Sequence, residues 1–439
     1  MGSETSIRKV RGRRQERGIA LILAVVAIAV LTAVATEFAY NSRVDLQLAT
    51  NQRDEVRAYY LARSGIAISR LLLTFQKQVD KIKIPDLGAL FSNPNNRQPL
   101  NSNSPSIGLN LQLWKMARID CQMLQMMVKQ DPFGIEPRPL TASAPGGTSS
   151  RASPNDPGQQ AQRSFGGFRG CFLATIGDEE EKLNLNKIDA GMNYGGGALV
   201  ARMLEMFSDK RFDFVFDRED ANKVKVSPQD TLMALHDWMD ADETQSALNT
   251  TGVGDPFTKG FSDENALYDH YTPRYKVKNA PFDSLDELYM VHGVSDRFMA
   301  AFGSRLTVYP DVNAKMNINT DDPLLLKMVI FSLVDPLHVP PQLNDPYFIE
   351  DLIRQVRAAR ILPGFGMSVS DFALLIQAAG VPINRLLASN IQGNQMLSDK
   401  SSTFSIKSVG EAGAVQKTIT AVVRMDDNGM GRLVHWREE

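Results

Sequence analysis

The chain has 439 residues and a formal net charge of −2, which is the length of two to three ordinary domains. Hydrophobic residues make up 43% and charged residues 22%. This balance lets most of the chain bury a core, and it gives no reason to expect nucleic acid as the main partner. The two cysteines, Cys121 and Cys171, exclude a multi-disulfide framework and a four-cysteine metal site. One disulfide in an oxidising compartment and two free buried thiols both fit the sequence.

The N-terminus carries the strongest pattern. Residues 1–18 are polar and basic, and residues 19–36 form an uncharged apolar run. At about 1.5 Å per residue, this run just crosses a hydrocarbon core of roughly 30 Å as a helix. The basic side is expected to stay in the cytoplasm, which places the rest of the chain across the membrane. We predict one transmembrane anchor over residues 19–36.

The residues after the apolar run argue against a cleaved secretory signal peptide, which is the alternative. Residues 37–83 contain no proline, and their apolar residues recur at helical spacing. The pattern predicts one long helix over residues 19–80 that begins in the membrane and projects far out of it. Gly65 is the weak point of this helix, where we expect a bend or a close packing contact.

A basic leader that ends in Gly18, directly before an apolar run that begins at Ile19, resembles the type IV pilin and type II secretion pseudopilin superfamily. The resemblance implies that a prepilin peptidase cuts between these two residues and methylates the new N-terminus. Most members carry glutamate as the fifth residue of the mature chain, where this chain has Leu23. A carboxylate inside the bilayer costs about 2.5–3.5 kcal/mol on insertion scales, and major pilins are thought to offset that cost by pairing it with a neighbour's terminal amine.

Within the superfamily, the missing glutamate is typical of the protein K family of type II secretion systems, the large minor pseudopilins at the filament tip. The resemblance implies an α+β, pilin-like fold, in which a long N-terminal helix packs on an antiparallel sheet and a large helical domain is inserted between the strands. Alternating runs over residues 403–436, separated by tight turns, favour two or three closing strands. Earlier strands are expected at 171–176, 307–309 and 315–319, and helices at 111–129, 199–207, 230–239, 281–302, 323–333, 346–360 and 368–379.

These elements predict seven segments along the chain. They are a leader (1–18), the long helix (19–80), the start of the pilin-like domain (81–190) with a Pro/Ser-rich disordered loop (134–170), a first part of the helical domain (191–305), short strands (306–320), a second helical part (321–400) and C-terminal antiparallel strands (401–439).

Four carboxylates lie within residues 237–243, at the expected end of a helix. Carboxylates with loop carbonyls suit Ca²⁺, which takes six to eight oxygen ligands. The spacing is not that of an EF-hand, and by itself it favours a solvated acidic surface. The protein K family, however, holds calcium with a D-W-x-D-x-D pattern and a later acidic turn. The resemblance therefore implies a structural Ca²⁺ site whose ligands are Asp237, Asp240, Asp242, Asp263 and Glu264, although the later turn departs from the family pattern.

Residues 282–302 resemble a helix-hairpin-helix, a motif that can bind the DNA backbone, and residues 362–376 look similar. The first segment carries four carboxylates against Arg297 alone, a charge that repels phosphate. We therefore expect packed hairpins of an interaction domain and no nucleic acid partner. No G-x-S-x-G, H-E-x-x-H or Walker A motif is present, and the five histidines form no ligand pair at helical spacing. The sequence predicts that the protein is not an enzyme.

The resemblance implies a minor pseudopilin of a type II secretion system, anchored in the bacterial inner membrane with its bulk in the periplasm. The implied partners are other minor pseudopilins, the major pseudopilin and the prepilin peptidase, with secreted substrates or the outer-membrane channel as further contacts. Two alternatives stay open, a minor pilin of a type IV pilus and a membrane-anchored binding module that is never processed.

Overall fold

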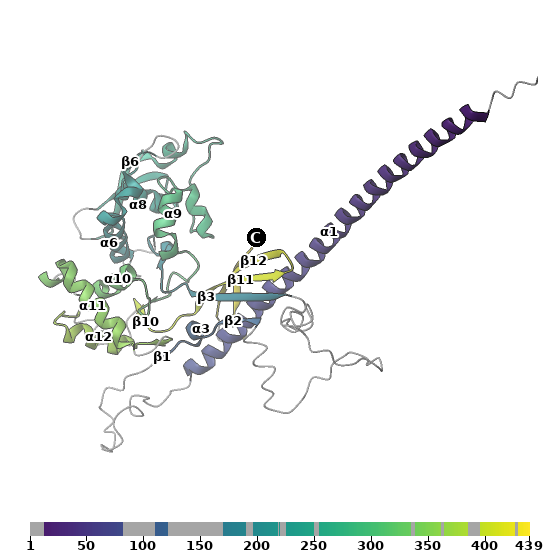
Figure 1. Ribbon diagram of the computed structural model, residues 1–439. Coiled ribbons are helices and arrows are strands. Elements are labelled where there is room, and N and C mark those ends of the chain that lie inside the picture. Colours follow the sequence, from purple (N-terminus) through teal and green to yellow (C-terminus); the bar gives the residue numbers. More distant parts are fainter. Residues whose placement is uncertain are drawn as a thin grey trace, which may run out of the picture.

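The structure is a computed structural model, and it describes residues 13–81, 110–121, 170–189, 196–217, 219, 225–249, 254–334, 339–360, 364–384, 396–425 and 429–439. One helix, α1 (Arg13–Lys81), has 69 residues, which makes it about 100 Å long. Its N-terminal half projects away from the rest of the chain, and its C-terminal half lies along a sheet (Figure 1). The long helix predicted from the sequence is confirmed.

A five-stranded antiparallel sheet packs on the second half of α1. Its order is β13-β12-β11-β3-β2, and every neighbouring pair is antiparallel. The strands are β2 (Ile119–Asp120), β3 (Cys171–Asp178), β11 (Thr403–Ala412), β12 (Val415–Arg424) and β13 (Arg432–Glu438). The helix buries one face, on which Ala58, Ala62, Ile66, Ser69 and Leu73 recur every three or four residues. This spacing places them on a single stripe, so the helix is amphipathic where it meets the sheet.

The sheet is continuous in space but not in sequence. Neighbouring strands β3 and β11 pair from Asp178↔Phe404 to Cys171↔Glu411, and the described residues between Asp178 and Thr403 lie outside this sheet. We call these residues the insertion. It forms a mainly helical body beside the sheet (Figure 1). The α+β class, with a long helix on an antiparallel sheet and an added helical body, is therefore confirmed.

The insertion contains short helices and strands in this order along the chain. They are β4 (Leu183–Asn184), η2 (Leu185–Lys187), α6 (Gly196–Phe207), η4 (Lys210–Phe212), α7 (Asp213–Phe216), α8 (Pro228–Asp237), β5 (Thr244–Leu248), β6 (Phe257–Asp263), η5 (Glu264–Tyr268), η6 (Leu285–Met290), α9 (Asp296–Phe302), η7 (Gly303–Arg305), β7 (Leu306–Thr307), β8 (Met316–Asn317), α10 (Pro323–Leu333), η8 (Pro341–Asn344), α11 (Pro346–Ala359), β9 (Phe365–Gly366), α12 (Val369–Ala378) and β10 (Leu397–Ser398). Before β2 lie β1 (Asn110–Leu111) and α3 (Leu113–Met116).

Helix α10 joins the two hydrophobic cores of the insertion. Leu325 and Met328 pack into the core of α6, α8 and α9, whereas Leu326, Val329 and Ile330 pack into the core of α11 and α12. A helix with apolar residues on all sides must be covered on all sides, so the sequence of α10 requires its central place.

Two acidic residues, Asp178 at the end of β3 and Glu180 just after it, tie the insertion to the sheet. Asp178 accepts hydrogen bonds from the Glu180 amide at 2.8 Å and from Nδ2 of Asn317 at 3.0 Å. Glu180 accepts from the amide and hydroxyl of Ser402 at 3.1 and 2.6 Å. Burial raises the pKa of Asp178 well above its ordinary value, and burial also raises the pKa of Glu180. Asp178 and Glu180 therefore lie in a buried joint between the sheet and the insertion.

Several sequence-based assignments were wrong. The predicted helix over 111–129 ends at Met116 and gives way to strand β2, with residues 122–129 outside the described part. The region after residue 196 was expected to be helical with loops, but it contains the β5–β6 hairpin. Residues 285–290 form a 3₁₀ helix. In the second predicted hairpin, the described residues form the short strand β9, paired with β1, before α12.

Cys121 and Cys171 form a disulfide with a Cα–Cα distance of 5.5 Å. This bond settles the choice that the sequence left open, because the pairing of β2 with β3 brings the two residues together. The predicted leader up to residue 12, the polar stretch before residue 110 and the predicted loop over 134–169 lie outside the described residues.

Candidate metal site

The end of α8 meets the β5–β6 hairpin at an acidic cluster. Helix α8 begins at a capping box, in which the Ser227 hydroxyl accepts from the Asp230 amide and the Asp230 carboxylate accepts from the Ser227 amide. Such a box fixes where a helix starts. The helix ends at Asp237, and β5 then pairs with β6 so that Thr244 lies opposite Asp263. This pairing brings Glu264, the first residue after β6, back toward the end of α8.

Asp237, Asp240 and Glu264 hold buried oxygens that have no hydrogen-bond partner among the described residues. The carboxylate of Asp237 is 1% exposed, and its Oδ1 accepts from the Ser246 amide at 2.8 Å while Oδ2 is unpaired. Oδ1 of Asp240 is unpaired, as are both carboxylate oxygens of Glu264, which is fully buried. A fifth unpaired oxygen is Oδ1 of Asn279, whose Nδ2 donates to the Asp242 carbonyl at 3.0 Å.

Such a set of buried, unpaired oxygens is costly unless protons or a cation satisfy it. The carboxyl groups repel one another, and burial removes them from water. Burial first, and then repulsion by Asp237, raises the pKa of Asp240 to about 7. Burial and repulsion by Asp240 raise the pKa of Glu264 to about 7 as well. Burial also raises the pKa of Asp237.

The oxygens fit a hard divalent cation. Calcium takes carboxylate and amide oxygens in flexible geometry, and all five unpaired atoms are of those two kinds. His236 also lies here, since one ligand atom each from His236, Asp237 and Asp240 lie within 4.8 Å of one another. Nδ1 of His236, however, is already 2.8 Å from the Ser246 hydroxyl. We therefore assign His236 to positioning Ser246 and Asp240, and a cation bound here would contact the oxygens.

Asp242 and Asp263 are engaged elsewhere. Asp242 accepts from the Thr244 amide at 2.8 Å and pairs with Nζ of Lys259 at 2.8 Å. Asp263 is exposed and caps η5 by accepting from the Asn265 amide at 2.9 Å. The structure thus brings three of the five candidate residues together at the buried oxygens and leaves these two at the rim. That all five hold a metal stays a prediction.

Sequence reasoning missed Asn279. It lies in the loop before η6, fifteen positions after Glu264, and has a left-handed backbone with φ of 49°. Asparagine tolerates this conformation better than most residues. Nothing in the local pattern marks it, because only the folded loop carries it to the cluster.

The candidate processing residues lie on the exposed part of α1. Ile19 and Leu23 are 60% and 65% exposed, and every residue from 18 to 49 is exposed. The helix contains an 18-residue window of mean hydropathy 2.9, none of it buried, so by length and composition it can cross a membrane. A single membrane anchor at this end fits such a helix.

The predicted hairpin over 282–302 presents acidic residues that pair within the chain. Asp283 and Glu287 both bind Nζ of Lys278, at 2.7 and 2.9 Å. Asp286 pairs with Arg437 of β13 at 2.6 Å. The segment therefore helps to hold the insertion against the sheet, and its charge is unfavourable for a phosphate backbone.

The fold is α+β and pilin-like, with one long helix on an antiparallel sheet and an added helical body, and the apolar part of the helix is long enough to cross a membrane. No known family profile and no curated protein sequence matches the chain. Among solved structures, it is similar to a chain of the crystal structure of the GspK-GspI-GspJ complex from the type 2 secretion system of enterotoxigenic Escherichia coli. The identity is 15%, the TM-score is 0.40, and the match covers 62% of this chain and 79% of that chain.

Proposed function

We propose that the protein is a minor pseudopilin of a type II secretion system that caps the tip of the periplasmic pseudopilus and helps to start its assembly. The observation that carries the proposal is the division of α1. Its first half exposes an apolar surface with nothing packed on it among the described residues, and its second half holds the sheet. Such a helix needs lipid around its first half, and neighbouring helices can take the place of lipid when subunits assemble.

The place of the insertion supports a tip position. It leaves the sheet between adjacent strands β3 and β11 and forms a body beside the pilin-like part (Figure 1). A subunit with such a bulky body is hard to stack beneath another copy. Leu23 fits the same position, because a subunit at the end of the filament has no further terminal amine to pair with a carboxylate.

The disulfide supports a periplasmic location. Cys121 and Cys171 are bonded, and structural disulfides persist in oxidising compartments such as the bacterial periplasm. The basic residues before the apolar run keep the N-terminus in the cytoplasm. A calcium ion at Asp237, Asp240 and Glu264 would act structurally, since it would neutralise the buried carboxylates and fix the β5–β6 hairpin to α8.

The test of the proposal is processing at Gly18. The full chain is produced in membranes with and without a prepilin peptidase, and the extracted protein is measured by intact mass and N-terminal sequencing. We expect a chain that starts at methylated Ile19 only when the peptidase is present. Gly18→Trp should block the cut, whereas the matched variant Gly12→Trp, in the same leader, should still be cut. A chain that keeps residues 1–18 with active peptidase would overturn the proposal and leave an unprocessed anchored binding module.

A second experiment separates the two machines. In the bacterium that carries the gene, deletion of the gene should stop export of the type II secretion substrates across the outer membrane. Surface pili should remain intact. Loss of pili with normal export would instead favour a minor pilin of a type IV pilus.

A further inference from the structure

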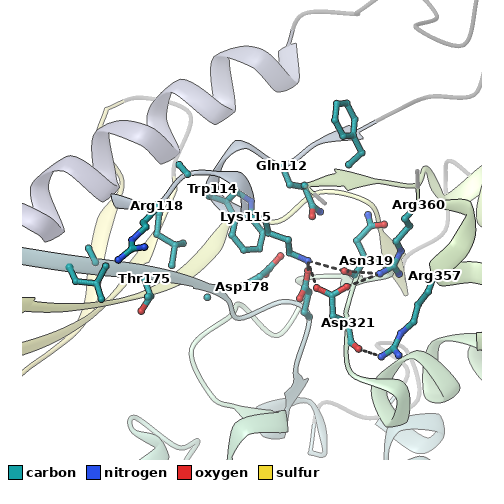
Figure 2. A pocket seen from close by; sticks show the side chains of 18 residues that line it. Gln112, Trp114, Lys115, Arg118, Thr175, Asp178, Asn319, Asp321, Arg357 and Arg360 are labelled. Atoms are coloured by element: carbon teal, nitrogen blue, oxygen red, sulfur yellow. Dashed lines mark hydrogen bonds and ion pairs between the residues drawn. The ribbon is translucent and has the colours of Figure 1, made fainter. Parts of the chain in front are cut away.

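A cavity of about 830 Å³ lies between the edge of the sheet and the α11 end of the insertion. One wall is β3 with the segment from Gln112 to Arg118, and the opposite wall comes from Asn319, Asp321, α11 and β9 (Figure 2). The cavity is far from the acidic cluster in sequence and shares no residue with it. Nothing in the proposed function uses it.

The β3 wall of the cavity includes a strand edge that no described strand covers. Strand β3 pairs with β11 along its whole length. On its other side, β2 pairs only with Leu173 and Ala174. Among the described residues, no strand pairs with Thr175, Ile176 or Gly177 on that side, and all three line the cavity. Backbone groups of alternate residues point to each side of a strand, so this edge offers a short ladder to an added strand.

The cavity is lined by more cations than anions. Lys115, Arg118, Arg357 and Arg360 line it. Arg118 has a side chain that is 80% exposed and pairs with Asp120 at 2.9 Å. The side chain of Arg360 is 9% exposed, and its Nη1 and Nη2 donate to the carbonyls of Thr320 and Ile318, each at 3.0 Å. A guanidinium held in place at the wall of a cavity favours a carboxylate in the adjacent space, and the Asp321 carboxylate already lies there, with Oδ1 3.1 Å from Nη1 of Arg360.

One carboxylate of the chain, that of Asp321, already lies between Arg360 and Lys115 in the cavity. Asp321 is 77% exposed, its Oδ1 is 3.1 Å from Arg360, and its Oδ2 is 3.7 Å from Lys115. Arg357 donates to the Asp321 carbonyl. The other acids are committed, since Glu181 pairs with Lys115 at 2.5 Å and Asp178 accepts from two donors within the joint. Because Asp321 is exposed, it can move aside for an incoming carboxylate at little cost in burial.

We propose that this cavity binds an extended acidic segment of a partner protein, which adds as a strand to the edge of Thr175–Gly177 and places a carboxylate against Arg357 and Arg360. The strand edge supplies backbone hydrogen bonds, and the cations select acidic side chains. The three-residue edge accommodates about 10 Å of extended chain, so the recognised segment is short.

The test uses the full chain in detergent micelles and a fluorescein-labelled hexapeptide with the sequence TEVEVT. Binding is measured by fluorescence anisotropy at two salt concentrations. Two control peptides are TKVKVT, which reverses the charge, and TEVEVT with alternate amides N-methylated, which cannot pair as a strand. The protein variants are Arg118→Glu and Arg357→Glu. The matched control is Arg354→Glu, on the same helix α11, with a 76% exposed side chain outside the cavity.

We expect saturable binding of TEVEVT that weakens with salt and that each cavity variant lowers about tenfold, the effect of losing one charge contact. Arg354→Glu should bind as the unaltered protein does. Amide hydrogen exchange in residues 175–177 should slow on binding. Absence of saturable binding, equal binding of either control peptide, or binding without slower exchange in residues 175–177 would each overturn the proposal. This result does not depend on whether Gly18 is cut.

Discussion

A Cβ atom on Gly65 of α1 would lie 2.1 Å from the hydroxyl oxygen of Ser408 on β11. Helix and sheet therefore approach more closely here than a methyl group allows. A second close approach lies about one helical turn earlier along α1. There, a Cβ on Gly410 of β11 would lie 2.0 Å from the Ala58 carbonyl oxygen and 2.5 Å from the Ala62 amide nitrogen. The close packing of the helix on the sheet therefore depends on glycine, which has no side chain, at positions 65 and 410.

These contacts predict that Gly410→Ala destabilises the protein more than Gly65→Ala. The obstacle for residue 410 is helix backbone, which cannot move alone, whereas residue 65 meets mainly two side chains, those of Ser408 and Phe172. Overpacking typically costs 1–3 kcal/mol, and alanine in a helix returns up to about 1 kcal/mol over glycine. Thermal unfolding of the detergent-solubilised chain measures both variants.

The control for this pair is Gly197→Ala in α6, where the nearest atom to a new Cβ is Pro256 Cδ at 3.8 Å. It should not lower the melting temperature. Equal melting temperatures for Gly410→Ala and the unaltered protein would contradict the close packing.

Calcium should stabilise the folded chain through Asp237, Asp240 and Glu264. At free calcium 100 times the Kd, linkage adds about 2.7 kcal/mol, and each kcal/mol raises the melting temperature of a large domain by about 2–4 °C. Asp240→Asn and Glu264→Gln should abolish most of this rise. Differential scanning calorimetry with calcium and with a chelator measures it.

Asp269→Asn is the matched control for the calcium response. The side chain of Asp269 is 71% exposed, and its ion pair with Arg274 is long, at 3.8 Å. Because Asp269 is not one of the proposed calcium ligands, the calcium-dependent rise in melting temperature should persist in this variant. A rise that persists equally in Glu264→Gln, or that is lost in Asp269→Asn, would place the ion elsewhere.

The calcium-free protein should lose stability as the pH rises from about 4 to 7. The folded pKa values of Asp240 and Glu264 lie near 7, above the unfolded values near 4, so the folded state holds more protons in this window. Stability falls with pH wherever the folded state binds more protons than the unfolded state. Melting curves from pH 4 to 8 in chelator should therefore decline, and calcium should flatten them.

The double variant Asp240→Asn, Glu264→Gln removes the two groups that titrate. It should melt higher than the unaltered protein at pH 8 in chelator, because two buried charges are gone. A lower melting temperature at that pH would show that the carboxylates are already satisfied without a cation.

Reduction of the disulfide between Cys121 and Cys171 should lower the stability of the pilin-like part. The bond joins residues 50 positions apart, and the chain-entropy model gives about 4 kcal/mol for a loop of that size. Dithiothreitol should lower the melting temperature of the unaltered protein. The double variant Cys121→Ser, Cys171→Ser should already melt low and should not respond to the reductant, and a response from it would assign the effect to another cause.

The sequence by itself determined the elements whose pattern is local. The uncharged run over 19–36 and the proline-free residues after it required α1, and the alternation near the C-terminus required β11 to β13. Helix α10 has the bounds predicted for it, because Asp322 caps it and Pro323 begins it. The carboxylates of residues 237–243 were visible as a group because they are adjacent in the chain.

Tertiary structure alone decided what depends on contacts between distant residues. The short strand β2 replaced the end of a predicted helix because Ile119 and Asp120 pair with β3, which follows a long stretch of chain. The same pairing joined the two cysteines. Glu264 and Asn279 reach the acidic cluster, and Asp242 and Asp263 stay at its rim, because the β5–β6 register and the loop before η6 fix their directions. Spacing in sequence counts residues along the chain, whereas burial and pairing depend on which segments the fold brings together.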